Sequence, residues 1–494
     1  MLPDLPYYRN EKRKGRRYLE EILKLESEEI EKEKKQVKQG INMTEGSLWK
    51  KVLLFALPLA CTGVLQQLFN AADVAVVGQF TGELGAHCMA AVGACASLIS
   101  LLVNLFIGIS IGSNVVIANA VGANDERRVR KAAVVSIWIA LVGGIGLTIL
   151  GEAIASTVLQ WMGVPEEVFD MADLYMQIYL IGMPVILLYN FEAAIFRGIG
   201  NPKLPLIALS IAGVINVILN IILVAGFHMN VDGVAIATVV SNLISSIVLF
   251  LFLLRNKLIS IPALFHHPIQ KDLLANILRI GIPSGIQSSV FSIANVVIQS
   301  GFNSLGTIVM ASSSAAINIE AIEYNIMSSF GHACTTFTGA NYGANKIERC
   351  KKVLKTCLLE GFGVTFVTAG IIILFGHQLL SLFNSNPEVI DNGYIRLVTL
   401  LCSYFFSIQY EVISGYLRGF GISVLPAALT TVGVCVLRIF WILFVFPLHP
   451  TYQTILAVFP LSLGSAAILL ILALIFTRPA NRRLKAMAKK AALA

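Results

Sequence analysis

A single carboxylate, Asp73, lies inside the first long apolar stretch of the sequence, which begins near Trp49. A charged aspartate at the centre of a membrane-spanning helix costs about 2.5 to 3.5 kcal/mol on the insertion scale, so it usually faces an interior cavity and has a function there. The chemistry open to it is the binding of a cation or a proton. The structural alternative is a carboxylate paired with a neighbouring amide such as Asn70. We expect ion or proton binding.

The amino-acid composition is that of a membrane protein. Apolar residues make up 56% of the chain and charged residues only 13%, and the mean hydropathy is +0.76, whereas charged residues make up about 25% of a soluble domain. The eight cysteines and seven histidines are dispersed, so they predict no metal site. The net charge of +8 could suggest nucleic acid. The basic residues cluster beside apolar segments, however, so we expect membrane lipids as partners and no nucleic acid.

Apolar segments recur along the chain at the length that one helical crossing needs, about 20 residues. The sequence therefore predicts an all-α polytopic membrane protein with twelve transmembrane helices. The expected spans are 50–78, 88–120, 132–156, 172–195, 204–227, 234–254, 281–303, 308–340, 353–376, 395–416, 424–447 and 454–476.

Lysine and arginine are concentrated in every second connection between these segments. By the positive-inside rule this alternation places both termini in the cytosol of a cell with the protein in its plasma membrane. Residues 1–46 are then a charged cytosolic extension, 255–280 a cytosolic linker and 479–494 a basic cytosolic tail. Arg396, near the outer start of the tenth segment, is the one charge that does not fit the alternation.

An internal repeat divides the chain into two halves. The sequence Gly122-Ala-Asn124 recurs as Gly343-Ala-Asn345, and Arg197-Gly-Ile-Gly200 recurs as Arg418-Gly-Phe-Gly421, both at an offset of 221. Six spans per half is an even number, so both halves enter the membrane from the same side and are related by an axis along the membrane normal. The expected units are an N-lobe and a C-lobe with a cavity between them. Their expected limits are 47–254 and 281–478.

The stretch from Gln66 to Phe80, which contains Asn70, Asp73 and Gly78, resembles a bacterial multidrug and toxic compound extrusion (MATE) transporter, as do the two repeated motifs. The resemblance covers residues 43–478. It implies twelve helices in two lobes that form an outward-opening V. It also implies export of organic, cationic and amphipathic small molecules by alternating access, in exchange for sodium ions or protons. We expect a monomer that is not an enzyme and needs no cofactor other than a bound sodium ion.

One branch of this family has a cation site with an aspartate on helix 1, an asparagine and an aspartate four residues apart on helix 5, and a threonine on helix 6. The matching positions here are Asp73, Asn216, Asn220 and Thr238. Asn220 departs from the pattern, which usually has an aspartate there. Asn216 and Asn220 lie on one helical face, and hard oxygen ligands suit a sodium ion. A polar pair that only packs two helices is the alternative.

Other charged residues inside spans are candidates for the cavity or the substrate site: Glu192, Glu320, Glu323, Glu411 and Arg438. A second branch of the family has acids on helices 7 and 10, and the aligned positions here are not acidic. A buried arginine needs a partner, so we expect Arg438 to pair with Glu320 or Glu411. The remaining carboxylate would then face an organic cation, unless all of these residues serve structural pairing alone.

The function expected from the sequence is that of a cation-coupled antiporter. The nearest alternative is a flippase for lipid-linked or polysaccharide substrates from the same superfamily, which would need a more basic cavity. A membrane-embedded enzyme is the alternative from another class. It lacks support because no nucleophile, histidine and acid recur at a shared depth of the spans. The sequence leaves open the substrate and the choice between sodium and protons.

Overall fold

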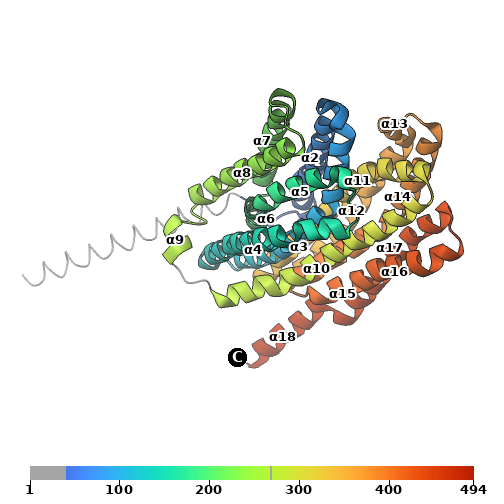
Figure 1. The fold of residues 1–494 in the computed structure, drawn as a ribbon. Coiled ribbons are helices and arrows are strands. Elements are labelled where there is room, and N and C mark those ends of the chain that lie inside the picture. Colours follow the sequence, from blue (N-terminus) through green and yellow to red (C-terminus); the bar gives the residue numbers. More distant parts are fainter. Residues whose placement is uncertain (1–39, 267–269, 494) are drawn as a thin grey trace, which may run out of the picture.

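The computed structural model describes residues 40–266 and 270–493, which fold into helices joined by short connections (Figure 1). The first half contains α2 (Leu48–Phe80), α3 (Gly85–Gly122), α4 (Glu126–Trp161), α5 (Glu166–Ile181), α6 (Met183–Gly198), α7 (Lys203–Asn220), the π-helical turn η2 (Ile221–Gly226) and α8 (Val231–Arg255).

The second half repeats this order after a short helix, α9 (Ile261–His266). It contains α10 (Lys271–Ser304), α11 (Thr307–Gly343), α12 (Ile347–Leu374), α13 (Gly376–Ser381), α14 (Pro387–Gly419), α15 (Val424–Thr430), η3 (Thr431–Val436), α16 (Leu437–Phe440), η4 (Trp441–Val445), η5 (Phe446–Leu448) and α17 (Tyr452–Thr477). The basic tail continues as α18 (Pro479–Leu493). Figure 1 shows green helices of the first half on one side and orange and red helices of the second half on the other.

Twelve membrane-spanning units account for these helices, as the sequence predicted. Among the described residues, ten helices are long and apolar enough to cross a membrane, and α5 with α6 forms an eleventh, bent span. The twelfth is α11, whose 37 residues reach about 55 Å at 1.5 Å per residue. Its many serines, threonines and asparagines lower its hydropathy, but it packs against α2, α3, α12 and α14, which shield it from lipid.

Proline accounts for the break in the fourth span, which the sequence did not predict. Pro184 lies in the first turn of α6, and the axes of α5 and α6 differ by 50°. Proline has no N–H to donate to the carbonyl four residues earlier, which here belongs to Leu180. That carbonyl instead accepts a hydrogen bond from Thr148 Oγ1 at 2.7 Å. A neighbouring helix thus satisfies the polar group that the bend would otherwise leave unpaired in the membrane.

The two lobes meet through equivalent helices, as a two-fold axis requires. Helix α2 packs against α11 and α12, and α10 packs against α3 and α4. Because α10, α11 and α12 repeat α2, α3 and α4, these two sets of contacts are one set repeated by the symmetry. A further contact between the lobes joins α3 to its own repeat, α11.

Glycines allow the helices of the two lobes to approach each other closely. Gly122 packs on the carbonyl of Ala340, and Gly343 packs on the carbonyl of Asn119. These two contacts exchange under the offset of 221, so the repeated Gly-Ala-Asn motif packs on its own copy across the lobe boundary. Farther along α3, Gly112 lies against the backbone of α10 at the Ile277 carbonyl. All of these contacts lie towards the end of the molecule that carries the basic loops.

The described residues before α2 also join the two lobes. The Ile41 N–H donates to the Gly200 carbonyl of the N-lobe at 2.8 Å, and Asn341 of the C-lobe donates to the Met43 carbonyl at 3.1 Å. Arg349 adds a hydrogen bond to the Glu45 carbonyl at 2.9 Å. The sequence placed this stretch within the extension 1–46. Residues 40–46 belong to the packed body, and 1–39 lie outside the described residues.

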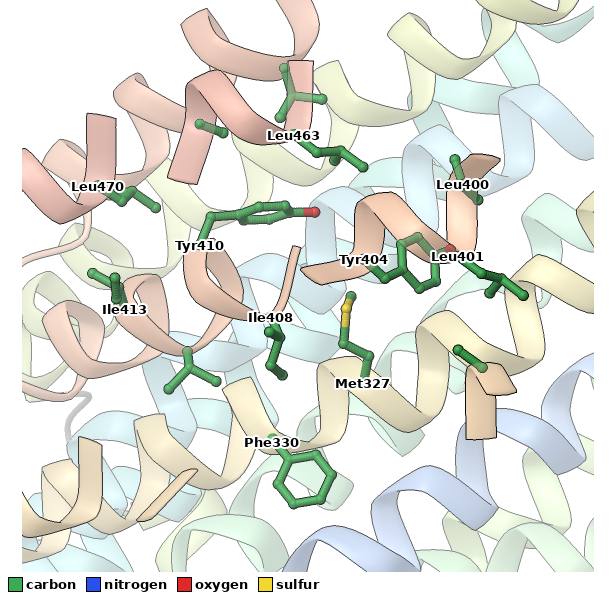
Figure 2. Close-up of a cluster of buried hydrophobic side chains, with 14 of the residues drawn as sticks. Met327, Phe330, Leu400, Leu401, Tyr404, Ile408, Tyr410, Ile413, Leu463 and Leu470 are labelled. Atoms are coloured by element: carbon green, nitrogen blue, oxygen red, sulfur yellow. The ribbon is translucent and has the colours of Figure 1, made fainter. Parts of the chain in front are cut away.

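A continuous apolar core holds α11, α14 and α17 of the C-lobe together. Figure 2 shows Met327 and Phe330 of α11 near Tyr404 and Ile408 of α14, with Leu463 of α17 on the other side of α14. All five residues are at most 6% exposed. This core holds α11 and α14, the two helices that carry the candidate residues Glu320, Glu323 and Glu411, in place against α17.

We predict that Gly112→Ala destabilises the purified protein, because the new methyl group would overlap the Ile277 carbonyl. Overpacking of this kind costs about 1 to 3 kcal/mol. Gly93→Ala is the matched control on the same helix, where a methyl group meets open space. Thermal unfolding in detergent measures both. Equal melting temperatures for the two variants would show that the lobes do not depend on this close approach.

Candidate functional site

Three helices of the N-lobe bring the four predicted cation-site residues together. Asp73 on α2 accepts a hydrogen bond from Asn220 Nδ2 at 2.5 Å through Oδ1 and from Thr238 Oγ1 at 3.2 Å through Oδ2. Asn220 Nδ2 also lies 3.2 Å from Asn216 Oδ1. We call these four residues the Asp73 cluster. Among the described residues, no lysine or arginine forms a salt bridge with Asp73.

The local structure of α7 explains the placement of the two asparagines. Asn216 and Asn220 are one turn apart, and both face the interior, at 4% and 0% exposure. Asn220 is the last residue of α7, and the π-helical turn η2 begins at the next residue. Wider turns of this kind are frequent at functional sites. Thr238 reaches the same point from α8, which packs along α7.

The chemistry of the Asp73 cluster suits one monovalent cation or one proton. Its oxygens come from one carboxylate, one hydroxyl and two amides, which are the hard ligands that a sodium ion prefers. Asn220 Oδ1 is buried and has no hydrogen-bond partner among the described residues. Such an atom needs an explanation in a folded protein, and a bound cation beside Asp73 provides one. The residues present therefore fit the sodium ion that the sequence suggested.

The other N-lobe candidate, Glu192, forms no ion pair with the part of the chain that the structure describes. It is fully buried on α6, and its Oε2 accepts a hydrogen bond from Ser246 Oγ of α8 at 2.9 Å. Its Oε1 has no partner among the described residues. Glu192 thus joins two helices inside the lobe and keeps one free oxygen.

The three predicted C-lobe carboxylates have different partners. Glu320 of α11 forms a bidentate ion pair with Arg396 of α14, in which Nε donates to Oε1 at 2.8 Å and Nη2 donates to Oε2 at 3.0 Å. Glu411 accepts a hydrogen bond from the Tyr324 hydroxyl at 3.1 Å. Glu323 accepts one from Thr368 Oγ1 at 2.8 Å and leaves its Oε2 unpaired.

The expected pairing of Arg438 with Glu320 or Glu411 is wrong. Arg438 donates instead to Asn295 Oδ1 at 2.9 Å and to Ser462 Oγ at 3.1 Å. Its guanidinium also lies 5.2 Å from the ring centres of Phe291 and Phe459. Glu320 pairs with Arg396 of α14, and Glu411 accepts a hydrogen bond from Tyr324, so neither of the two expected carboxylates bonds to Arg438 on α16. Arg438 is therefore a buried cation whose partners in the described chain are neutral.

Sequence reasoning also missed one buried carboxylate, Glu360 of α12. It is 8% exposed, and neither of its carboxylate oxygens has a hydrogen-bond partner among the described residues. The sequence did contain the pattern, because Glu360 interrupts an apolar run just as Asp73 does. The described residues contain no group of three or more histidine, cysteine, aspartate or glutamate side chains that could hold a metal ion.

Comparisons with known proteins agree with this architecture. A family model described as MatE matches residues 58–222 and 283–443, which is more than half of the chain and one segment in each lobe. The chain belongs to the MatE family. It is thus a multi-pass membrane protein of a family of multidrug efflux transporters.

Two bacterial proteins are among its relatives. The chain is 28% identical over 404 residues to the "Probable multidrug resistance protein YoeA" of Bacillus subtilis (strain 168), covering 78% of this chain and 84% of the relative. It is 26% identical over 401 residues to the "Probable multidrug resistance protein NorM" of Thermotoga maritima, covering 79% and 84%.

Solved structures of the family share the fold. One is described as the "Outward-facing conformation of a multidrug resistance MATE family transporter of the MOP superfamily". It superposes with a TM-score of 0.81 over 91% of this chain and 98% of that chain, at 23% identity. Twelve helices in two lobes related by a two-fold axis are therefore shown for this member of the MatE family.

We predict that Glu320→Gln lowers the melting temperature of this MatE protein strongly. The change leaves the buried Arg396 without a counter-charge, and breaking one partner of a buried pair typically costs about 3 to 5 kcal/mol. Thermal unfolding of the purified protein measures the loss. The double variant Glu320→Gln/Arg396→Gln should recover part of it, because no charge is then left unpaired. A double variant as unstable as both losses added together would contradict the pairing.

Proposed function

We propose that this MatE protein is a cation-coupled antiporter that exports organic, cationic and amphipathic compounds across the plasma membrane, and that the Asp73 cluster binds the coupling ion. The observation that carries the proposal is the Asp73 carboxylate, which is held by neutral groups beside the unpaired Asn220 Oδ1. The coupling ion is a sodium ion or a proton. The names of the relatives, which describe multidrug resistance proteins, support the substrate class.

Helix α2 offers a route from the ion site to the lobe contact. Its last third carries Asp73 in the N-lobe, whereas its first turns, with Val52 and Phe55, belong to the core of the C-lobe. The Phe55 ring packs edge-on against Phe337 of α11 at 5.5 Å. Pro58 lies between the two parts of α2, and proline inside a helix is a common site of bending.

The proposed cycle uses this connection. When the ion binds, it neutralises Asp73 and tightens α2, α7 and α8 around the cluster. When the ion leaves, the charged Asp73 carboxylate has only neutral hydrogen-bond donors around it, and α2 shifts at Pro58. The shift changes the contact of α2 with α11 and α12. Either state of Asp73 thereby favours one arrangement of the lobes, which is the differential affinity that coupling requires.

The proposed orientation follows from the basic loops. The glycine contacts between the lobes lie at the end that carries these loops, which the positive-inside rule places in the cytosol. In this orientation both termini are cytosolic and the conformation is closed to the cytosol. We propose that the protein works as a monomer, because both halves of the repeat lie in one chain.

We predict that Asp73→Asn keeps the fold but abolishes gradient-coupled efflux, because an amide of the same size cannot release a proton or neutralise a sodium ion. Efflux of a fluorescent organic cation from cells measures the effect. Asp173→Asn is the matched control: Asp173 accepts hydrogen bonds from Ser156 and Gln177 in the same lobe, outside the Asp73 cluster. Full coupled efflux by Asp73→Asn would refute the proposal. Efflux by the wild type under neither gradient would favour a flippase.

We predict the orientation from labelling of single cysteines in a variant that lacks the eight native cysteines. Glu166 begins α5 and Asn386 directly precedes α14, both at the end of the molecule without basic loops. Cysteines at these two positions should react with a membrane-impermeant reagent in intact cells. Cysteines at Asp125 and Lys346 should react only after the membrane is opened. The reverse pattern would overturn the orientation and place the closed end outside.

A further inference from the structure

A pocket lies away from the Asp73 cluster, between the start of α2 and the middle of α12. Its volume is 570 Å³, within the range of about 300 to 1,000 Å³ that is typical of small-molecule sites. Trp49 and Lys50 of α2 line one part, and Glu360, Gly363 and Val367 of α12 line another. We call it the Glu360 pocket.

The position of the Glu360 pocket places it in the membrane half next to the basic loops. Glu360 is 13 residues after Ile347, where α12 begins, which is about 20 Å along the helix. The first turns of α12 carry lysines, including Lys355, and the apolar part follows. Trp49 is 54% exposed, as is typical of tryptophans at a membrane interface. The pocket therefore leads from the interface into the apolar layer.

The unpaired carboxylate is the feature that points to a ligand. Glu360 is 8% exposed, its two oxygens have no hydrogen-bond partner, and no basic side chain of the described chain lies within salt-bridge distance. A carboxylate left this way within a membrane span is costly and usually has a function. Behind it, Thr368 lines the same pocket and donates to Glu323, whose other oxygen is also unpaired.

The remaining walls select the kind of cation. Leu53, Val364 and Val367 make the pocket mainly apolar. A small hydrated ion would lose its water there, whereas a cation covered by apolar groups gains contacts and meets Glu360 in a low dielectric. Lys50 lines the same pocket, but it is exposed and forms no salt bridge with Glu360 in the described chain.

We propose that the Glu360 pocket binds a lipophilic organic cation taken from the membrane leaflet on the side of the basic loops. The cation pairs with the Glu360 carboxylate, and the apolar walls hold its hydrocarbon groups. This inference rests on the proposed function, because it names the phase from which the exporter takes its substrate. It requires no step at the Asp73 cluster.

Fluorescence quenching of Trp49 tests the proposal in the full chain, reconstituted in lipid nanodiscs. Trp138, Trp161 and Trp441 are replaced by phenylalanine, which leaves Trp49 as the only tryptophan. The probe is 4-bromophenyl(triphenyl)phosphonium, whose bromine quenches on contact, and the comparison is its uncharged isostere 4-bromotetraphenylmethane at equal membrane concentration. The cation should quench Trp49 saturably and at about tenfold lower concentration than the uncharged compound, because its charge is attracted to the Glu360 carboxylate.

Two variants separate the contribution of the Glu360 charge from that of the shape of the pocket. Glu360→Gln should remove the advantage of the cation. Gly363→Leu should abolish quenching by both compounds, because a side chain there fills open space without meeting the backbone. Glu348→Gln, at the exposed start of the same helix, is the matched control and should change nothing. Size-exclusion chromatography checks that each variant is folded.

Two results would overturn the proposal. Equal quenching by the cation and the uncharged compound would mean an apolar groove for lipid chains, and an undiminished advantage of the cation in Glu360→Gln would mean that the carboxylate does not bind it. In Asp73→Asn the cation should keep its advantage over the uncharged compound, because this advantage depends on Glu360, although a shift of α2 can change the concentration at which both compounds quench Trp49. Failure of the Glu360 pocket is thereby distinguished from failure of the proposed coupling at Asp73.

Discussion

The hydrogen bonds from Asn220 and Thr238 to the Asp73 carboxylate are the interaction on which the proposed mechanism depends. They hold an anion inside a membrane span with neutral groups alone. Neutral donors orient a carboxylate without cancelling its charge, so the cluster retains an affinity for one positive charge. A salt bridge at this position would have removed that affinity. The C-lobe shows the contrast, because there Arg396 neutralises Glu320.

Helix packing connects the Asp73 cluster to the contact between the lobes. Helix α2 belongs to both lobes, since its start packs in the C-lobe core and its end carries Asp73. The lobes touch through glycines such as Gly112 and Gly122, where the backbones of facing helices meet directly. Such a contact has little freedom to deform gradually. A shift of α2 therefore exchanges one packed arrangement for another, as alternating access requires.

Much of the fold followed from the sequence, because the signals were periodic and local. Apolar segments of spanning length predicted the twelve helices, and the offset of 221 predicted the two lobes. The spacing of Asn216 and Asn220 placed both on one helical face. That Asp73 and Thr238 meet them came from the family resemblance, since no spacing within one helix relates residues of α2, α7 and α8. The structure brings the four together, and their role in ion binding stays a proposal.

The errors about Arg438, Arg396 and the fourth span have a common physical origin. The partner of Arg438 depends on which faces of α11, α14 and α16 meet, and this is a property of packing rather than of sequence distance. Arg396 seemed misplaced for the same reason, because its counter-charge is Glu320 on another helix. The break at Pro184 depends on whether a neighbour such as Thr148 can satisfy the freed carbonyl. Glu360 is a different case, because its prediction needed no knowledge of packing. A carboxylate inside an apolar segment is the signal that singled out Asp73, and the same signal applies to Glu360.

Counter-movement of ions during substrate transport tests the central claim most directly. Purified protein in proteoliposomes is given a gradient of an organic cation, with radioactive sodium on the opposite side and a pH-sensitive dye enclosed. The account predicts that movement of the organic cation drives either sodium or protons in the opposite direction, and that replacing Asp73 by asparagine stops this counter-movement. Transport of the organic cation by the wild type with neither sodium nor protons moving would contradict it.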